Sequence, residues 1–202
     1  HVSAIGADAN SASRYARSKA AGEAGVKSAF PTATILRPSI VFGPDDDFFN
    51  RFGTMAEAFS FLPLIGGGQT KFQPVYVDDV ARAALAALTS DAAEGQTYEL
   101  GGPTIYSFRD LMELVVAQTG RKCRLVQIPF WLASLEATFL ELLPTPPLTR
   151  DQVVLLKSDN VVSDGAATLA DLGITPTACE AILPTYLDRF RTGGRYNRFR
   201  AA

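Results

Sequence analysis

The sequence predicts a mixed α/β fold in which most strands pair in parallel. Short apolar runs typical of buried strands alternate along its 202 residues with longer segments of helical periodicity. Parallel pairing requires this order, because the chain must cross back over the sheet, usually as a helix, before it adds the next strand. A hydrophobic content of 47% supports a substantial core for a chain of this length.

The first two strands and the helix between them have clear local signals. Residues 1–5 are expected to be the end of a buried strand, and Ser11 or Ser13 can cap the helix that follows. Residues 33–36 form the next short strand, which leads into Arg37 and Pro38, where proline disfavours a helix.

The rest of the chain continues this alternation. A loop-rich stretch at 43–73 contains an amphipathic helix at 48–59. The other predicted elements are, in order, a strand at 74–77, a helix through Leu88 capped by Asp78 or Asp79, a strand at 97–100, a helix from Ser107 to Gly120, a strand at 124–128, helices at 129–143 and 149–157, and helical segments at 168–172 and 177–190.

Composition excludes several classes of protein. The formal net charge of −2 argues against nucleic-acid binding. Cys123 and Cys179 are far apart and His1 is the one histidine, so neither a zinc site nor any other metal site nor a disulfide framework is expected, and a reducing compartment fits best. The absence of a signal-peptide pattern and of an 18-residue apolar run disfavours a secreted or membrane-spanning protein.

Tyr15 and Lys19 form the pattern with the most direct chemical meaning. On a helix, their spacing of four residues places a phenol and an ammonium on one face, about one turn apart. The ammonium would favour the tyrosinate, and the hydroxyl of Ser3, twelve positions before the tyrosine, could bind a carbonyl or an alcohol. Such groups can move a proton while a cofactor moves a hydride. An isolated pair at this spacing is more often ordinary helix surface, so the interpretation depends on the surrounding motifs.

Five motifs follow one another in the first half of the chain. They are His1-Val2-Ser3, Tyr15-x-x-x-Lys19, the run from Leu36 to Gly43, the run from Pro74 to Ala81, and the run from Tyr98 to Gly102. Together they resemble the extended and atypical short-chain dehydrogenase/reductases, over residues 1–102. Five linked motifs are far more specific than any one of them.

A second set of motifs narrows this resemblance. They are Ser13-Arg14-Tyr15 with Lys19-Ala20 and Gly22-Glu23, Phe30-Pro31, Phe42-Gly43 with Asp46 and Phe48, the run from Gln73 to Val77, Leu148-Thr149-Arg150-Asp151, and the run from Leu169 to Ile174. In these the chain is similar to the NAD(P)H-binding accessory subunits of respiratory complex I and their bacterial relatives, nearly to its end.

The resemblance implies a role for each candidate residue. Ser3 would orient a reacting carbonyl, and Tyr15 would be the general acid or base. Lys19 would bind the nicotinamide ribose and lower the pKa of the tyrosine. Pro38 and Ser39 would lie against the nicotinamide carboxamide through their backbone groups. The implied cofactor is NADP or NAD, with NADPH favoured.

The glycine-rich part of such a cofactor domain does not occur in this sequence. No G-x-G-x-x-G or G-x-x-G-x-x-G pattern, which would hold the pyrophosphate at a helix N-terminus, is found. The chain is therefore expected to be the C-terminal part of a Rossmann-type parallel sheet with a small mixed α/β lobe, its glycine-rich N-terminal half absent. The expected domains are a partial NAD(P)-binding domain at 1–42 and 74–102, a substrate or partner lobe at 43–73 and 103–190, and a basic tail at 191–202.

Several polar and glycine-rich segments allow two interpretations. The run from Gly66 to Gly68 is expected to be a flexible connection rather than a phosphate cradle, since no helix with an apolar stripe follows at once. Substrate contacts and a solvated helix cap explain equally well the polar residues Asp45, Asp46, Asp47, Asn50 and Arg51.

Two segments near the C-terminus raise the question of partners. The helix at 130–143 is apolar around most of its circumference, which favours burial in the lobe over docking on a partner subunit or peripheral membrane contact. Disorder is the default for the basic tail, and contact with acidic lipid or protein is the second interpretation. Its arginines are Arg189, Arg191, Arg195, Arg198 and Arg200.

Two classes of function follow. By resemblance the chain is an accessory or assembly component of respiratory NADH:quinone oxidoreductase (complex I), with complex I subunits as partners and no turnover of its own. Its location would be the bacterial cytoplasm, the cytoplasmic face of the inner membrane, or the matrix side in mitochondria. The alternative is an active NAD(P)-dependent reductase or dehydrogenase, or a sugar-nucleotide epimerase or dehydratase, that uses Tyr15 as its acid or base.

Overall fold

Parallel pairing dominates the computed structural model, which describes residues 1–144 and 146–194. Within these residues three strand pairs are parallel and one is antiparallel. The parallel pairs are β1 (Ile35–Pro38) with β6 (Thr97–Leu100), β2 (Val41–Phe42) with β5 (Val75–Tyr76), and β3 (Phe61–Ile65) with β8 (Arg124–Ile128), and the antiparallel pair is β4 (Lys71–Phe72) with β7 (Tyr106–Ser107). The predicted mixed α/β class is confirmed.

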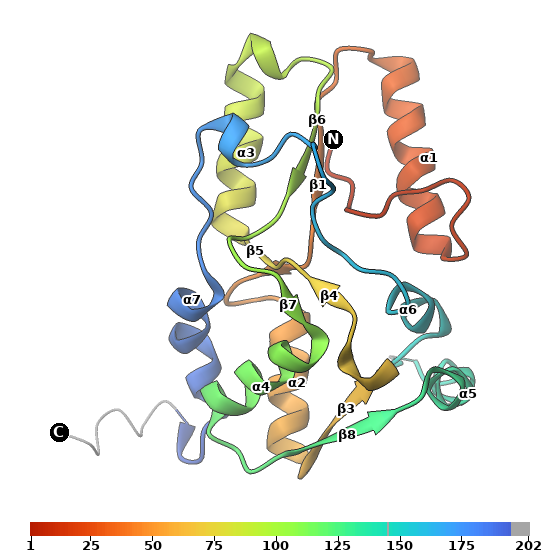
Figure 1. Cartoon of the computed structure of the whole chain (residues 1–202), viewed down its shortest axis with the longest axis vertical. Helices are drawn as coiled ribbons and strands as arrows, with labels where there is room; N and C mark the ends of the chain where they lie inside the picture. Colours follow the sequence, from red (N-terminus) through yellow and green to blue (C-terminus); the bar gives the residue numbers. More distant parts are fainter. Residues whose placement is uncertain (145, 195–202) are drawn as a thin grey trace, which may run out of the picture.

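The segment at 1–5 lies beside β1 as a parallel strand, as expected. Ser3 N donates to Leu36 O at 2.7 Å and Ile5 N donates to Pro38 O at 3.0 Å. On the other side of β1 lies β6, whose Tyr98 pairs in turn with Ala167. The helices α1 (Arg14–Ala29) and α3 (Val77–Thr89) flank these strands on either side (Figure 1).

Local capping signals predicted most helix starts. Ser13 is the residue that caps α1, since its hydroxyl accepts from Ala16 N. Ser107 and Thr149 cap the helices that follow them through complete capping boxes. For five further helices the predicted start or span agrees with the structure. They are α2 (Phe48–Ala58), α4 (Phe108–Thr119), α5 (Phe130–Leu140), α6 (Arg150–Leu155) and α7 (Cys179–Tyr186).

The predicted cap of α3 is wrong. The strand β5 runs straight into the helix, so Tyr76 is the N-cap residue and Asp78 and Asp79 fall in the first turn. Asp79 is 1% exposed, and its carboxylate accepts from the backbone N–H of Thr177 at 2.6 Å. The Asp79 carboxylate, which was predicted to cap α3, therefore binds the distant Thr177 instead.

Short elements depart from the predicted pattern. The expected loop at 43–73 contains β3 and β4, whose partner strands lie far along the chain. The predicted helix at 168–172 is only a 3-10 turn, η3 (Ala170–Leu172), and the segment at 177–190 divides into α7 and η4 (Leu187–Phe190). Another short 3-10 turn is η2 (Asp91–Ala93).

The glycine run forms a defined turn rather than a flexible connection or a phosphate cradle. Gly66–Gly68 is the 3-10 turn η1, and all three residues have positive φ. A Cβ at Gly66 would lie 2.2 Å from Cζ of Phe130, so the absent side chain makes room for that ring. Gly66 therefore serves packing, and the positive φ of all three residues forms the turn.

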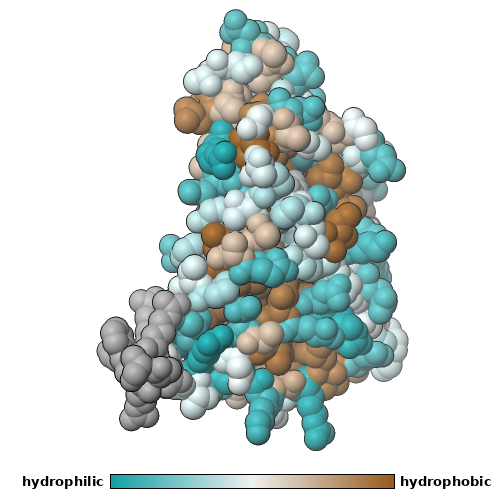
Figure 2. Space-filling model, turned by 60° about the vertical axis from the view of Figure 1, so that its left-hand side comes forward, coloured by the Kyte–Doolittle hydropathy of each residue, from teal (hydrophilic) through white to brown (hydrophobic). Residues whose placement is uncertain are grey.

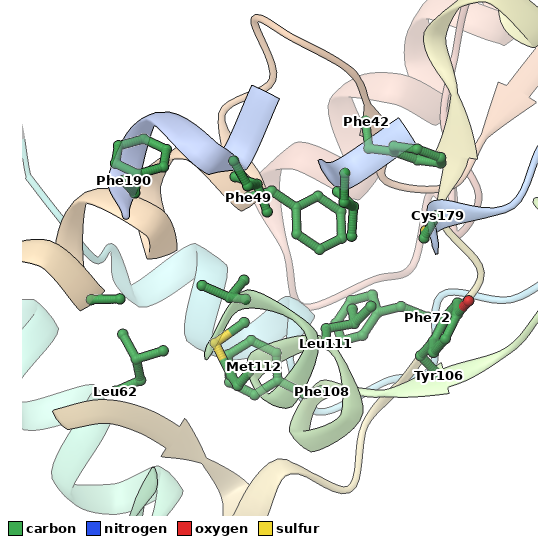
Figure 3. Close-up of a cluster of buried hydrophobic side chains, with 14 of the residues drawn as sticks. Phe42, Phe49, Leu62, Phe72, Tyr106, Phe108, Leu111, Met112, Cys179 and Phe190 are labelled. Atoms are coloured by element: carbon green, nitrogen blue, oxygen red, sulfur yellow. The ribbon is translucent and has the colours of Figure 1, made fainter. Parts of the chain in front are cut away.

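The main core is rich in aromatic residues (Figure 3). It includes Phe42, Phe49, Leu62, Phe108 and Leu111, and the labelled side chains come from the strands β2, β3, β4 and β7, the helices α2, α4 and α7, and η4. A second cluster lies between α3 and the β1–β6 pair, and a third lies between α5 and α6.

The expectation that α5 is buried is wrong. Only Ala133 and Ala137 are buried on this helix, where they pack against Val153 of α6. Trp131 is 69% exposed and Phe139 is 65% exposed. Alanines on this helix face the core, and Trp131, Leu135 and Phe139 face solvent. The composition of the helix does not indicate which of its apolar residues are buried.

The surface mixes apolar and polar residues on the face shown in Figure 2. In the part of the chain at 1–144 and 146–194, no helix is long and apolar enough to cross a membrane. Of the tail arginines, Arg195, Arg198 and Arg200 lie outside the described residues. Arg189 and Arg191 pack against the lobe, where the Nε of Arg191 donates to Gln118 O at 2.7 Å and an Arg189 nitrogen donates to Asn50.

Candidate functional site

Tyr15 and Lys19 lie together on the first two turns of α1, as their spacing predicted. The ammonium of Lys19 lies over the Tyr15 ring, 5.5 Å from its centroid. Tyr15 is 47% exposed and Lys19 is partly buried. A molecule in solvent can therefore reach both groups from the same side of the helix.

The pKa of Tyr15 differs from the sequence expectation. Partial burial raises the pKa of its phenol, because a less polar environment disfavours the tyrosinate. The expected lowering of this pKa by Lys19 stays a prediction, and the cause that acts in the structure is burial. The contact between the two residues is an ammonium on the face of a ring.

Ser3 is not presented to solvent. It is 3% exposed, and its Oγ has no partner in hydrogen-bonding geometry. The hydroxyl is nevertheless close enough to the Glu23 carboxyl to help lower its pKa. Among the described residues, no hydrogen bond joins Ser3 to Tyr15 or Lys19. Its assigned role in orienting a carbonyl stays a prediction.

An ion-pair group under the helix holds α1 in place against the sheet. Arg37 of β1 donates two hydrogen bonds to Glu23 of α1, at 2.8 and 2.7 Å, and lies 3.5 Å from Glu99 of β6. Burial would raise the pKa of Glu23, but the Arg37 guanidinium and the Ser3 hydroxyl hold it below its ordinary value. The same pair raises the pKa of Arg37. Glu23 lies one turn after Lys19 on the same side of α1, so this group fixes the part of the helix that follows the Tyr15–Lys19 pair.

Pro38 and Ser39 lie at the end of β1, and both are buried. The Pro38 carbonyl accepts from Ile5 N at 3.0 Å, and Ser39 N donates to Leu100 O at 2.9 Å. The Ser39 hydroxyl donates to Asn160 Oδ1 at 2.6 Å. The backbone groups expected to meet a carboxamide are thus already used within the fold, and their contact with a cofactor stays a prediction.

The residues present therefore fit the ribose side of a nicotinamide riboside better than its carboxamide side. Tyr15 and Lys19 offer an exposed phenol and ammonium of the kind that bind ribose hydroxyls. The carboxamide side offers fewer free groups, because Pro38 and Ser39 are engaged.

Two residues that the sequence did not single out lie next to these candidates. Asp151 of α6 accepts the backbone N–H groups of Arg14 and Tyr15, at 2.7 and 3.1 Å. Asn160 contacts Ser39, and its side-chain amide also donates to Ile5 O at 3.3 Å. Asp151 was visible only as the last residue of a motif, and its partners are 136 or more positions away.

The polar loop at 45–51 is a helix cap. One oxygen of the Asp46 carboxylate accepts from Phe49 N at 2.6 Å and Asn50 N at 3.1 Å, and the other accepts from Gly43 N at 3.1 Å and from the Tyr186 hydroxyl. A pocket of about 280 Å³ beside it is lined by residues 41–46 and Val77, and none of the candidate residues lines it. This pocket is separate from the Tyr15 face.

Comparison with known proteins agrees with the motifs. Residues 3–101 match the NAD dependent epimerase/dehydratase family. The chain is 40% identical over 203 residues to NADH dehydrogenase (ubiquinone) 1 alpha subcomplex subunit 9, mitochondrial, of Arabidopsis thaliana, with 96% of this chain and 50% of that protein aligned. It is 36% identical over 194 residues to the protein of the same name from Mus musculus, with 95% and 51% aligned. The 40 kDa subunit of NADH-ubiquinone oxidoreductase from Neurospora crassa is 31% identical, with 98% and 52% aligned.

The chain thus spans about half the length of the curated relatives it matches. Solved structures share its fold. A dTDP-glucose 4,6-dehydratase from Streptomyces venezuelae, solved with NAD, has a TM-score of 0.65 at 18% identity, covering 100% of this chain and 60% of that one. A UDP-glucose 4-epimerase from Thermus thermophilus, also with NAD, has a TM-score of 0.63 at 20% identity, covering 94% and 62%. Residues 3–101 therefore match the NAD dependent epimerase/dehydratase family, and over most of its length the chain is a homologue of the alpha subcomplex subunit 9 of mitochondrial NADH dehydrogenase.

Proposed function

We propose that this chain is part of a nicotinamide-dinucleotide-binding accessory or assembly subunit of NADH:ubiquinone oxidoreductase. Relatives matched over most of the chain are subunits of that enzyme by name. Tyr15 and Lys19 would contact the nicotinamide riboside. The bound cofactor would supply a hydride donor or acceptor, and in this proposal the site holds it without turnover.

The observation that carries the proposal is the contrast between Tyr15 and Ser3. The tyrosine is 47% exposed, whereas Ser3 is 3% exposed and its hydroxyl has no exposed atom to offer a substrate. A reductase of this kind needs a hydroxyl donor at the reacting oxygen as well as the proton-transferring phenol. The accessible residues suffice to bind a cofactor but not to hold a substrate carbonyl.

The second candidate is an active reductase, dehydrogenase, epimerase or dehydratase. It is favoured by the retention of an exposed Tyr15 with Lys19 beside it. The fold neighbours are also enzymes that act on sugar nucleotides, by their names. In this reading the phenol gives or takes the proton while the nicotinamide exchanges the hydride.

NADPH is the proposed form of the cofactor, on the resemblance to NAD(P)H-binding accessory subunits. The matched family is NAD dependent by its description, which supports a nicotinamide dinucleotide, and the preference for NADPH rests on the resemblance alone. Titration of the full-length protein with NADPH and with NADH, followed by nicotinamide fluorescence, compares the two dissociation constants directly. Tighter binding of NADH would overturn the preference without affecting the site.

Lys19→Ala is expected to weaken nucleotide binding by about tenfold or more. A hydrogen bond from a charged donor is worth about 1.5–3 kcal/mol, and 1.4 kcal/mol is a factor of ten in affinity. The measurement is the same fluorescence titration. Lys27→Ala is the matched control, because Lys27 is an exposed lysine near the end of the same helix and its ammonium donates to Thr97. Equal affinities for both variants and the wild type would place the nucleotide elsewhere.

Tyr15→Phe separates the two candidate functions. An accessory role predicts that it leaves co-migration with NADH:ubiquinone oxidoreductase on native gels, and the activity of that enzyme, almost unchanged. An enzyme predicts that the same change abolishes cofactor oxidation. A protein that is isolated free of nucleotide and of the complex, and that turns over a dehydrogenase substrate, would contradict the accessory proposal.

Association with the complex would place the protein at the matrix side in mitochondria or at the cytoplasmic face of the inner membrane in bacteria. The exposed apolar side of α5 is the proposed contact, either with a partner subunit or with the membrane surface. Its large side chains Trp131, Leu135 and Phe139 follow one another at intervals of four residues and are all more than half exposed.

A further inference from the structure

The backbone N–H groups at the start of α1 are capped from a distant part of the chain. The first two, of Arg14 and Tyr15, donate to opposite oxygens of the Asp151 carboxylate. The third, of Ala16, donates to the Ser13 hydroxyl, and that hydroxyl in turn donates to Asp151 at 2.9 Å. A helix leaves these donors without partners inside the helix, and a negative charge at this end is favourable. Asp151 therefore holds the backbone of the residue that carries the phenol.

The helix that supplies Asp151 is itself held firmly. Thr149 and Gln152 form a complete capping box at the start of α6. Val153 is buried against α5 and Ile65, and Arg150 pairs with Glu141 at 2.9 Å. Figure 1 shows α6 below the N-terminal end of α1. The position of Asp151 is thus set by the C-terminal lobe.

The pKa of Asp151 agrees with this role. Burial alone would raise it, but the N–H groups of Arg14 and Tyr15 and the Ser13 hydroxyl hold it below the ordinary aspartate value. The carboxylate stays charged at neutral pH, and each of its oxygens has a donor.

A second contact comes from the same stretch of chain. Asn160 binds the Ser39 hydroxyl through Oδ1 and the Ile5 carbonyl through Nδ2. Its backbone N–H also donates to Lys71 O at 2.8 Å, which attaches it to β4. Residues 149–160 therefore touch both the helix of Tyr15 and the strand ends beside Ser39.

We propose that Asp151 is a positioning residue of the nicotinamide site, and that residues 149–160 clamp the C-terminal lobe onto Tyr15 and Ser39. The inference rests on the proposed nucleotide site and adds that nucleotide binding is coupled to the docking of α6. A nucleotide bound at Tyr15 and Lys19 stabilises the docked position of α6, and displacement of α6 weakens the nucleotide by the same factor.

The test is Asp151→Asn in the full-length protein, with dissociation constants measured for NADPH and for a fragment that lacks the nicotinamide, 2′-phospho-ADP-ribose. The substitution removes the charge and leaves one acceptor for two backbone donors. We expect NADPH to bind about tenfold more weakly and the fragment to bind as it does to the wild type. Asp164→Asn is the control, because Asp164 is an exposed carboxylate of the same lobe.

The results separate three cases. If NADPH and the fragment both bind more weakly by the same factor, the substitution causes a general structural defect and the positioning role is overturned. Unchanged binding of NADPH would also overturn the positioning role. A wild-type protein that binds neither compound would remove the proposed nucleotide site itself.

A second measurement needs no variant, in case Asp151→Asn does not fold. Hydrogen exchange of the wild-type protein is followed with and without NADPH. The clamp predicts slower exchange both at the start of α1 and in α6. Protection of α1 alone would overturn the linkage, because α6 would then not respond to the nucleotide.

Discussion

Glu23 is the buried carboxylate through which α1 is attached to the sheet. It is 6% exposed and accepts two hydrogen bonds from Arg37, which also lies near Glu99. A buried charge is tolerated only with a partner of opposite charge, so the loss of one member leaves the other uncompensated. The position of α1, and with it that of Tyr15 and Lys19, depends on this attachment.

Glu23→Gln is expected to lower the free energy of unfolding by about 3 kcal/mol at pH 7, the order found when one partner of a buried pair is removed. Because the folded-state pKa of Glu23 is lowered, its stabilising contribution is complete above the ordinary glutamate pKa of about 4.3 and is lost as the pH falls below it. The difference between variant and wild type should therefore shrink from pH 7 to pH 4 in chemical denaturation.

Glu113→Gln is the control for this change, because Glu113 is an exposed glutamate of α4. Its unfolding should match that of the wild type at both pH values. A Glu23→Gln difference that is the same at pH 7 and pH 4 would mean that the ion pair is not what the substitution removes.

At the scale of elements, the turn η1 lies between β3 and β4 and packs against the start of α5. Gly66 combines a φ of +62° with a gap that the Phe130 ring fills. A side chain there meets both a strained backbone and an occupied volume. The turn therefore leaves room for the first residue of α5.

Gly66→Ala is expected to destabilise the fold by about 1–3 kcal/mol, from the positive φ and the clash with Phe130. Gly25→Ala is its opposite, because Gly25 lies inside α1 with no atom within 4 Å of an added Cβ, and it should stabilise by about 0.4–1 kcal/mol. Thermal unfolding of both variants tests whether Gly66→Ala lowers and Gly25→Ala raises the stability of the fold. Similar effects from both substitutions would contradict the packing role of Gly66.

At the scale of the whole molecule, the same segment links a possible partner surface to the nucleotide face. The outer side of α5 is apolar and exposed, its inner side packs on α6, and α6 carries Asp151 to the helix of Tyr15. Binding at either end can be transmitted through these contacts if the lobe moves as a unit, which the hydrogen-exchange experiment measures.

Replacement of Trp131 and Phe139 together by serine should leave the unfolding temperature of the protein nearly unchanged, since both side chains are mostly exposed. It should reduce co-migration with NADH:ubiquinone oxidoreductase on native gels if α5 is the contact. Leu88→Ser is the control, because Leu88 is 85% exposed on α3. Equal co-migration of all three proteins would exclude the outer side of α5 as the contact.

Local signals predicted the fold better than the site. The serine and threonine caps, the helical periodicities and the longer strands depend on residues within a turn or two of one another, and they were recovered. The strands β4 and β7 were missed because they have two residues each, and the five-residue β3 was missed because its pairing with β8 is set by a distant segment. Tyr15 and Lys19 were found because one helical turn brings them together.

The sequence by itself determined the α/β class, the family resemblance and the Tyr15–Lys19 pair on one helix face, since each rests on motifs or spacings along the chain. Only the tertiary structure decided that Ser3 is enclosed, that Asp151 caps the helix of Tyr15, and that the large side chains of α5 face outward. The physical reason is that burial and the pairing of polar groups depend on contacts between segments up to 155 residues apart. No local pattern specifies which of several carboxylates or apolar faces such a contact will use.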